Sequence, residues 1–320
     1  MNRRMLLATG AILVLMTGTP ATAQVEAPAQ LTIASGPISG GWYPMAGVFS
    51  ELIQARFPDT TLTVTTGGGV ENVPRVAGGV ADIGFTQADM LAASVEGRAP
   101  YEAAYEGVSA LGYLGFVPQA YFLVPDDADY QSIEQIIADQ VPVRLVVPPR
   151  NNGGELIIRR LLAEEGVTYE DIESWGGSVA FLGYGEVPGL IADGHADAYV
   201  GPVIGAIQEL VTQQDMRWLP WPEETIDAIL DQGYEKQVTP AGRWYFVDED
   251  TAVPALTNIL VVSAALDDAV VGELAAILAE NEQAIRESAG MFQSFSRDSL
   301  GQVSNVPVHP GAAAYFETMN

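Results

Sequence analysis

The chain has 320 residues, of which 48% are hydrophobic and 17% charged, and this balance excludes an intrinsically disordered or coiled-coil protein. Its 14 basic and 41 acidic residues give a net charge of −27, which argues against a nucleic-acid binder because phosphate contacts need clustered Lys and Arg. Because the sequence contains no cysteine, disulfides, thiolate metal sites and a cysteine nucleophile are also excluded.

The first residues have the pattern of an export signal. Arg3 and Arg4 precede an apolar run from Met5 to Met16, and Ala21-Thr-Ala23 has the A-x-A form of a cleavage site. We predict a signal peptide over residues 1–23, cleaved after Ala23, and a mature chain in the periplasm. The alternative is a membrane anchor, but a run of about 12 residues is too short for a hydrocarbon core of ~30 Å.

The mature chain is predicted to be even more acidic than the whole sequence. Loss of two arginines leaves 12 basic and 41 acidic residues, a net charge of −29, and lysine occurs only at Lys236. Such an excess is typical of a halophilic source, because salt screens the self-repulsion of the charges. The alternative is an acidic periplasmic protein of an ordinary bacterium.

The first half of the mature chain alternates strands with glycine loops and helices. We predict strands at 31–35, 61–65 and 83–85, each short and apolar or β-branched. Glycine-rich segments at 36–41 and 67–69 each lead into a predicted helix. Ala77-Gly-Gly-Val-Ala-Asp82 then precedes the third strand.

The same order of elements occurs a second time. We predict a strand at 143–147, a loop at 148–154 and a helix at 155–165 that ends at Gly166. Gly176-Gly-Ser178 is interpreted as the counterpart of 67–69, and Ala192-Asp-Gly-His-Ala-Asp197 precedes a strand at 198–200. The sequence therefore indicates an internal repeat.

Two strand–helix passes predict an α/β fold with two lobes, each built on a mostly parallel sheet flanked by helices. A strand at 255–263 and a helix at 267–290 are expected to return to the first lobe. Lobe 1 is accordingly assigned to 24–121 plus 253–320, and lobe 2 to 122–252. Glycine loops at the carboxyl ends of strands would meet in a cleft between the lobes, where helix N-termini favour an anion.

The sequence does not carry the common catalytic motifs. It lacks G-x-S-x-G, H-E-x-x-H, Walker A and G-x-G-x-x-G patterns, and a structural role is favoured for His195 and His309. We therefore predict no catalytic residue, no metal and no cofactor. A periplasmic enzyme on a two-lobed scaffold is the alternative.

Three motifs connect the chain with a known family. They are Ser35-Gly-Pro-Ile-Ser-Gly-Gly-Trp-Tyr-Pro-Met-Ala-Gly47, then Thr66-Gly-Gly-Gly-Val-Glu-Asn72 with Ala77-Gly-Gly-Val-Ala-Asp-Ile-Gly-Phe85, and finally Val306-Pro-Val-His-Pro-Gly-Ala312. In this order they resemble the TAXI-type solute receptors of tripartite ATP-independent periplasmic (TRAP) transporters. The chain departs from that family at Gly41, where threonine is frequent, and at 150–154, where a serine-glycine-threonine loop is common.

The resemblance implies a type II-like periplasmic binding protein fold that closes on a small solute and delivers it to the membrane permease subunits of a TRAP transporter. It implies a carboxylate ligand of the glutamate or 2-oxoglutarate class, and we expect the receptor to be a monomer. A receptor that feeds a sensor kinase remains a further alternative.

The candidate ligand residues of lobe 1 lie in three loops. They are Ser39, Gly40, Gly41, Trp42 and Tyr43, then Gly69, Val70 and Asn72, and then Gln87 and Asp89. The glycines would offer backbone N–H groups, and the two aromatic residues an apolar wall with polar tips. Core packing is the alternative for Trp42 and Tyr43, and helix capping for Asn72 and Asp89.

The candidate residues of lobe 2 are Arg150, Asn151, Asn152 and Gly153, with Gly177 and Ser178 as the repeat-derived addition. Arg150 is the basic residue that lies inside a proposed ligand loop, and its guanidinium suits a carboxylate. An ordinary surface position after two prolines is the alternative for this arginine.

Overall fold

The computed structural model describes residues 25–26, 28–38, 40–150, 152–303 and 306–319. The predicted signal peptide and its cleavage site, and the candidate residues Ser39 and Asn151, lie outside these described residues. Within them, no helix is both long and apolar enough to cross a bilayer.

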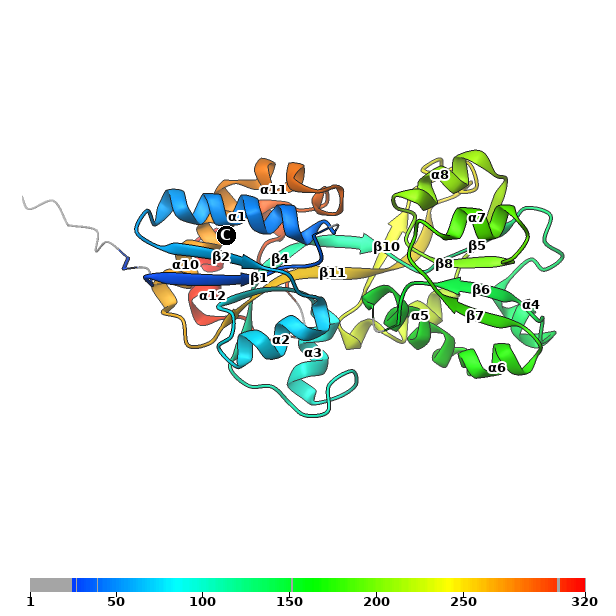
Figure 1. The fold of residues 1–320 in the computed structure, drawn as a ribbon, viewed down its shortest axis with the longest axis horizontal. Helices are drawn as coiled ribbons and strands as arrows, with labels where there is room; N and C mark the ends of the chain where they lie inside the picture. Colours follow the sequence, from blue (N-terminus) through cyan, green and yellow to red (C-terminus); the bar gives the residue numbers. More distant parts are fainter. Residues whose placement is uncertain (1–24, 27, 39, 151, 304–305, 320) are drawn as a thin grey trace, which may run out of the picture.

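The first lobe is built on a six-stranded sheet (Figure 1). Its strands follow the order β10 (Glu235–Thr239), β11 (Thr251–Ser263), β3 (Ile83–Gln87), β1 (Gln30–Ala34) and β2 (Thr61–Thr65), with β4 (Val108–Pro118) also paired to β11. The strands β1, β2 and β3 are parallel, whereas β11 runs antiparallel to β3, β4 and β10. Segment 235–239 therefore extends the first sheet, although it lies in the range that the sequence assigned to lobe 2.

The second lobe is built on a five-stranded sheet. Its order is β7 (Ser178–Phe181), β6 (Arg144–Val147), β8 (Ala198–Gly201), β5 (Tyr121–Pro125) and β9 (Met216–Leu219). The strands β6, β7 and β8 are parallel, and β5 is antiparallel to β8 and β9. Figure 1 shows the two lobes side by side, with β4, β10 and β11 running between them.

Helices flank both sheets. Those of the first lobe are α1 (Trp42–Arg56), α2 (Gly69–Ala77), α3 (Ala88–Glu96), α10 (Asp268–Glu280), α11 (Glu282–Ser288) and α12 (Pro310–Glu317). Those of the second are α4 (Ile133–Ala138), α5 (Gly153–Glu164), α6 (Tyr169–Ser174), α7 (Val187–Ala192), α8 (Ala206–Gln213) and α9 (Glu223–Asp227). The predicted two-lobed α/β architecture is thus confirmed.

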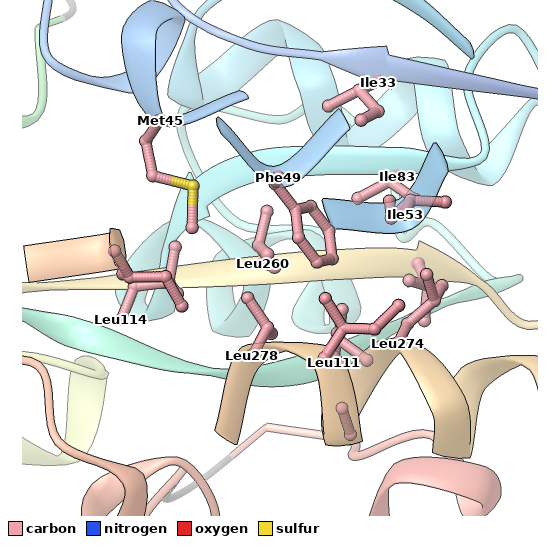
Figure 2. Close-up of a cluster of buried hydrophobic side chains, with 14 of the residues drawn as sticks. Ile33, Met45, Phe49, Ile53, Ile83, Leu111, Leu114, Leu260, Leu274 and Leu278 are labelled. Atoms are coloured by element: carbon pink, nitrogen blue, oxygen red, sulfur yellow. The ribbon is translucent and has the colours of Figure 1, made fainter. Parts of the chain in front are cut away.

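The core of the first lobe follows from helical periodicity. Met45, Phe49 and Ile53 recur every four residues, so they lie on one face of α1, and all three are fully buried. Figure 2 shows this face against Ile33 and Ile83 of the parallel strands. Burying each large side chain contributes roughly 1.5–3 kcal/mol, which fixes α1, and the loop before it, against the sheet.

The internal repeat is confirmed by the sheet order and by two aspartates. The sequence β2-β1-β3 in one sheet corresponds to β7-β6-β8 in the other. The Asp82 carboxylate accepts a hydrogen bond from the Thr32 backbone N–H at 2.7 Å, and the Asp197 carboxylate accepts one from the Arg144 N–H at 2.9 Å. Both aspartates therefore hold the backbone of the first strand of their repeat.

The repeat also corrects the assignment of Gly176-Gly-Ser178. Because residues 178–181 form β7, which pairs with β6, this strand is the counterpart of β2. The counterpart of the glycine loop 67–69 is then the loop 182–186, which runs from β7 into α7. Composition alone matched Gly176-Gly-Ser178 to the loop 67–69. The strand register instead shows which segments of the two repeats are equivalent.

The predicted single helix over 267–290 is wrong in one respect. It is divided into α10 and α11 at Asn281, whose backbone angles of φ −120° and ψ 34° leave the helical region. The Asn281 side-chain amide donates to the Ile277 carbonyl at 2.8 Å. This local hydrogen bond offers the backbone an alternative to continuing the helix.

Candidate functional site

The two lobes meet where glycine loops open α2 and α5. A Cβ atom on Gly69, the first residue of α2, would overlap the Gln87 side-chain Oε1. A Cβ atom on Gly153, the first residue of α5, would lie 3.4 Å from Gln87 Cδ and 3.2 Å from Leu256 Cδ1. The Gln87 side chain, from the end of β3, therefore lies between the N-termini of a lobe 1 helix and a lobe 2 helix.

Trp42 both packs in the core and reaches the candidate site, the two roles that the sequence left open for it. Its ring is only 8% exposed and stacks on Phe85, with 6.0 Å between the ring centroids. Its indole Nε1 donates to Asn258 Oδ1 at 3.2 Å. Its far edge also approaches Gly69, because a Cβ atom there would lie 3.4 Å from Trp42 Cη2.

The other residues of the first loop surround the start of α1. The Gly40 backbone N–H donates to the Pro37 carbonyl at 2.8 Å, which closes the loop, and Tyr43 is half-buried. Gly41 precedes α1, and a Cβ atom on it would overlap Met291 Sδ. The threonine that is frequent here in TAXI-type receptors would thus require Met291 to move.

Asn72 serves the scaffold of lobe 1. It is fully buried, and its side-chain amide nitrogen donates to the Ser35 carbonyl at 2.7 Å and the Phe85 carbonyl at 2.8 Å. These bonds tie the ends of β1 and β3 together and occupy both amide hydrogens. Val70, its neighbour in the first turn of α2, is half-buried.

Asp89 is buried where α3 meets the second lobe, with 2% of its surface exposed. Desolvation raises the pKa of its carboxyl to about 6, although the Tyr234 hydroxyl and the Arg160 guanidinium act in the opposite direction. Arg160 itself donates to Tyr234 at 3.1 Å and to the Ala99 carbonyl of lobe 1 at 3.3 Å. This position suits the contact between lobes better than a solute.

Arg150 lies on an aromatic platform in lobe 2. Its guanidinium carbon is 3.7 Å from the centroid of the Phe181 ring at the end of β7. Phe181 in turn contacts Tyr169 edge-on, at 5.4 Å between centroids. The neighbouring Arg144 and Arg159 pair with Asp197 and Glu155 instead.

The remaining lobe 2 candidates separate into two groups. Asn152 caps α5, because its Oδ1 accepts a hydrogen bond from the Gly154 N–H at 2.8 Å. Gly177 directly precedes β7, and Ser178 is the first residue of β7 and pairs with Arg144 at the beginning of β6. The structure therefore does not bring Gly177 and Ser178 together with Arg150 and Asn152, which follow the other end of β6.

Two candidate site residues were not predicted from the sequence, and both lie on segments that connect the lobes. Asn258 in β11 is 1% exposed, and its Nδ2 has no hydrogen-bond partner within the described chain. Gln119, between β4 and β5, is 5% exposed, and its Oε1 is likewise unpartnered among the described residues. A Cβ atom on Gly154 would lie 2.9 Å from that oxygen. A polar residue inside the apolar run 255–263 was the available signal for Asn258.

The site can hold an acceptor-rich solute by hydrogen bonds and local positive potential. Two helices of nine and twelve residues, α2 and α5, begin here, and their first N–H groups favour negative charge. Among the described residues, no group of acidic or histidine side chains could hold a metal ion. Two surface hollows, one between α1 and α11 and one beside Tyr130 and Asp197, lie outside this junction.

Comparisons with known proteins agree with this architecture. The NMT1-like family matches residues 33–319. The chain is similar to MatC from Rhodopseudomonas palustris with bound malate, at 12% identity, 92% of this chain and 100% of that one, and a TM-score of 0.54. It is also similar to a TctC solute binding protein from Polaromonas, at 16% identity, 91% and 98% coverage, and a TM-score of 0.52.

A third solved structure gives a similar result. PhnD1 from Prochlorococcus marinus, in complex with methylphosphonate, is 12% identical over 84% of this chain and 91% of that one, with a TM-score of 0.54. At these identities the likeness shows the fold. The predicted two-lobed periplasmic binding protein fold is confirmed.

Proposed function

The chain belongs to the NMT1-like family, and from this premise we propose that it is a periplasmic receptor that binds a small anionic solute and releases it unchanged. The observation that carries this proposal is the position of Gln87. Its side chain lies against Gly69 of one lobe and Gly153 of the other, so one solute at this point would contact both lobes. A solute that binds both lobes stabilises their closed arrangement by its differential affinity.

We favour a carboxylate as the solute. The beginnings of α2 and α5 supply N–H groups and partial positive charge, and Arg150 supplies a guanidinium that can form a bidentate pair with a carboxylate. The bound malate of MatC and the methylphosphonate of PhnD1 are both anions. Glutamate and 2-oxoglutarate, implied by the resemblance to TAXI-type receptors, are the first solutes to test.

Delivery to the permease subunits of a TRAP transporter is the finer part of the proposal. The motifs Ser35–Gly47, Thr66–Phe85 and Val306–Ala312 support it, and Trp42 and Gly69 of the candidate site belong to the first two of them. In this role the receptor acts outside the cytoplasm as a monomer after removal of residues 1–23. A neighbouring gene for a sensor kinase in place of a permease would instead favour the signalling alternative.

The central experiment is identification of the solute that the protein carries. The mature protein is purified without added solute and denatured, and the released small molecules are identified by mass spectrometry. We expect a carboxylate, whose affinity is then measured by calorimetry on protein refolded without it. A neutral or cationic solute would contradict the anion proposal.

A second measurement addresses the enzyme alternative. The identified solute is quantified before and after prolonged incubation with the protein. A receptor leaves its amount unchanged, whereas steady conversion would show catalysis and reject the transport proposal.

A further inference from the structure

We propose that Asn258 recognises an acceptor oxygen of the solute from the strand that connects the lobes, and that Trp42 orients it for this purpose. The inference rests on the proposed function, because it names how an anionic solute is recognised at the same site. It adds a specificity-determining residue from β11, outside the glycine loops.

The orientation of the Asn258 amide is fixed by its partner. The indole N–H of Trp42 can only donate, so the atom that faces it at 3.2 Å must be the amide oxygen. The Asn258 Nδ2 is therefore a donor, and within the described chain it has no acceptor. A buried donor without a partner is rare in folded proteins, because its desolvation is not compensated.

The unpaired donor lies beside the groups that form the site. Asn258 is directly opposite Gln87 in the antiparallel pair of β11 and β3, so both side chains project from the same face of the sheet. Gln87 is the side chain that lies between Gly69 and Gly153. Leu256, two residues before Asn258 on the same strand, also approaches Gly153.

The backbone at Asn258 is irregular in a way that supports a special role. The pairing of β11 with β4 shifts between Asn258 and Ile259, so that Asn258 is opposite Gly115 and Ile259 opposite Tyr113. Irregularities of this kind redirect a side chain and are frequent next to binding sites. The ladder with β4 is thus interrupted at the residue whose side-chain Nδ2 has no partner among the described residues.

The chemistry of this amide selects the class of group it binds. A neutral N–H donor in a buried position pairs with an oxygen acceptor, and the pair is stronger when the oxygen is charged. Because Trp42 holds the amide oxygen, the amide cannot turn to accept a bond from an ammonium or hydroxyl group of the solute. Asn258 therefore favours a carboxylate oxygen and disfavours a cationic group at the lobe 1 end of the solute.

The test is Asn258→Asp, which keeps an oxygen for the Trp42 indole while it removes the donor and adds negative charge. The probe is whichever of L-glutamate, 2-oxoglutarate and L-malate binds the wild-type protein most tightly by calorimetry. At pH 8 we expect the variant to bind it at least about a hundredfold more weakly. As the pH falls to 5, the ratio of variant to wild-type affinity should rise, because the introduced carboxyl becomes uncharged when it is protonated and can donate again.

The matched control is Asn281→Asp, which adds the same charge to lobe 1 at the junction of α10 and α11. Its affinity should stay within about twofold of wild type. If Asn258→Asp does not fold, Trp42→Phe tests the same arrangement, because it frees the amide to rotate. We then expect roughly three- to tenfold weaker binding, consistent with the loss of one orienting hydrogen bond.

Each outcome has a distinct meaning. Wild-type affinity in Asn258→Asp at pH 8, or in Trp42→Phe if it is the variant used, overturns this inference alone. An equal loss at pH 8 and pH 5 also overturns it, because a purely structural defect would not respond to protonation. Failure of the wild-type protein to bind any of the three carboxylates overturns the proposed carboxylate function, and this inference with it.

Discussion

Replacement of Asp89 by asparagine should stabilise the protein at neutral pH. This carboxyl is 2% exposed at the contact between α3 and the Tyr234 segment, and burial raises its pKa from 3.8 to about 6. At about 1.4 kcal/mol per pKa unit, ionised Asp89 costs roughly 3 kcal/mol of folding free energy above pH 6. Asparagine keeps the shape and avoids this cost, so Asp89→Asn should gain up to about 3 kcal/mol at pH 7.5.

The sign of the pH dependence follows from the direction of the shift. Because the folded-state pKa of Asp89 lies above the unfolded-state value, its contribution to stability is greatest below about pH 4 and is lost as the pH rises through about 6. When the pH is lowered from 7.5 to 5, protonation of Asp89 alone should raise the free energy of unfolding of the wild-type protein by about 1.4 kcal/mol. The difference in unfolding free energy between Asp89→Asn and wild type should therefore decrease by the same amount.

Urea unfolding of both proteins at pH 7.5 and pH 5 measures this difference. The lowered pKa values of Asp197 and Glu282 act in the opposite direction, but they are common to both proteins and cancel in the comparison. Asp59→Asn, at an exposed aspartate, is the control and should change stability little at either pH. A pH-independent effect of Asp89→Asn, or a loss of stability at pH 7.5, would refute the reasoning.

Three further predictions concern the site and the charge of the chain. Arg150→Ala should weaken the binding of an anionic solute about tenfold to more than a hundredfold. Phe181→Leu should weaken the binding by a smaller factor, because it removes only the ring under the guanidinium. Arg75→Ala should leave the affinity nearly unchanged, because Arg75 donates to the Thr66 carbonyl. Calorimetry tests all three variants, and wild-type affinity in Arg150→Ala would exclude that contact. Small-angle scattering should show a smaller radius of gyration with saturating solute; an unchanged value would argue against closure. About 1 M NaCl should raise the melting temperature beyond the effect of a neutral osmolyte, because it screens the acidic surface; no difference would reject self-repulsion as a major cost.

The repeated α/β scaffold could be predicted from sequence because its signals are local. Five of the parallel strands, β1, β2, β3, β6 and β8, are short apolar or β-branched runs beside a glycine loop or an A-x-G-x-A-D turn, and they were predicted close to their observed bounds. The parallel strand β7 was not predicted, because its first residue was interpreted as part of a glycine loop. The antiparallel strands β4, β5, β9 and β10 have no such glycine loop or turn motif beside them. Their place depends on pairing with segments far away in the chain, which periodicity does not encode.

The site was predicted less completely for the same reason. The sequence analysis identifies Trp42 but not Asn258, and the hydrogen bond between them joins residues 216 positions apart. Gly177 and Ser178 show the opposite kind of error, because the sequence predicted them in the site and the structure does not place them there. They have the composition of a ligand loop, yet the register of β7 with β6 puts them at the wrong end of the sheet. A glycine cluster indicates a tight turn, and only strand pairing decides which edge of the sheet that turn occupies.

Under the proposed function, the repeated elements and the segments that connect the lobes would have different roles in binding. Asp82 and Asp197 perform the same task in the two halves, so the repeat accounts for the parallel part of each sheet. Asn258 and Gln119 have no counterpart in that pattern, and each carries a buried polar atom without a partner among the described residues. The strand β11 packs into the cores of both lobes, through Leu260 in one and Leu256 in the other, so under the proposed function Asn258 would stay near the solute whether the lobes are apart or together. Under the proposed function, the Asn258 donor would contact the solute in lobe 1 before α5 and Arg150 of lobe 2 close over it, which would separate the choice of solute from the step that retains it.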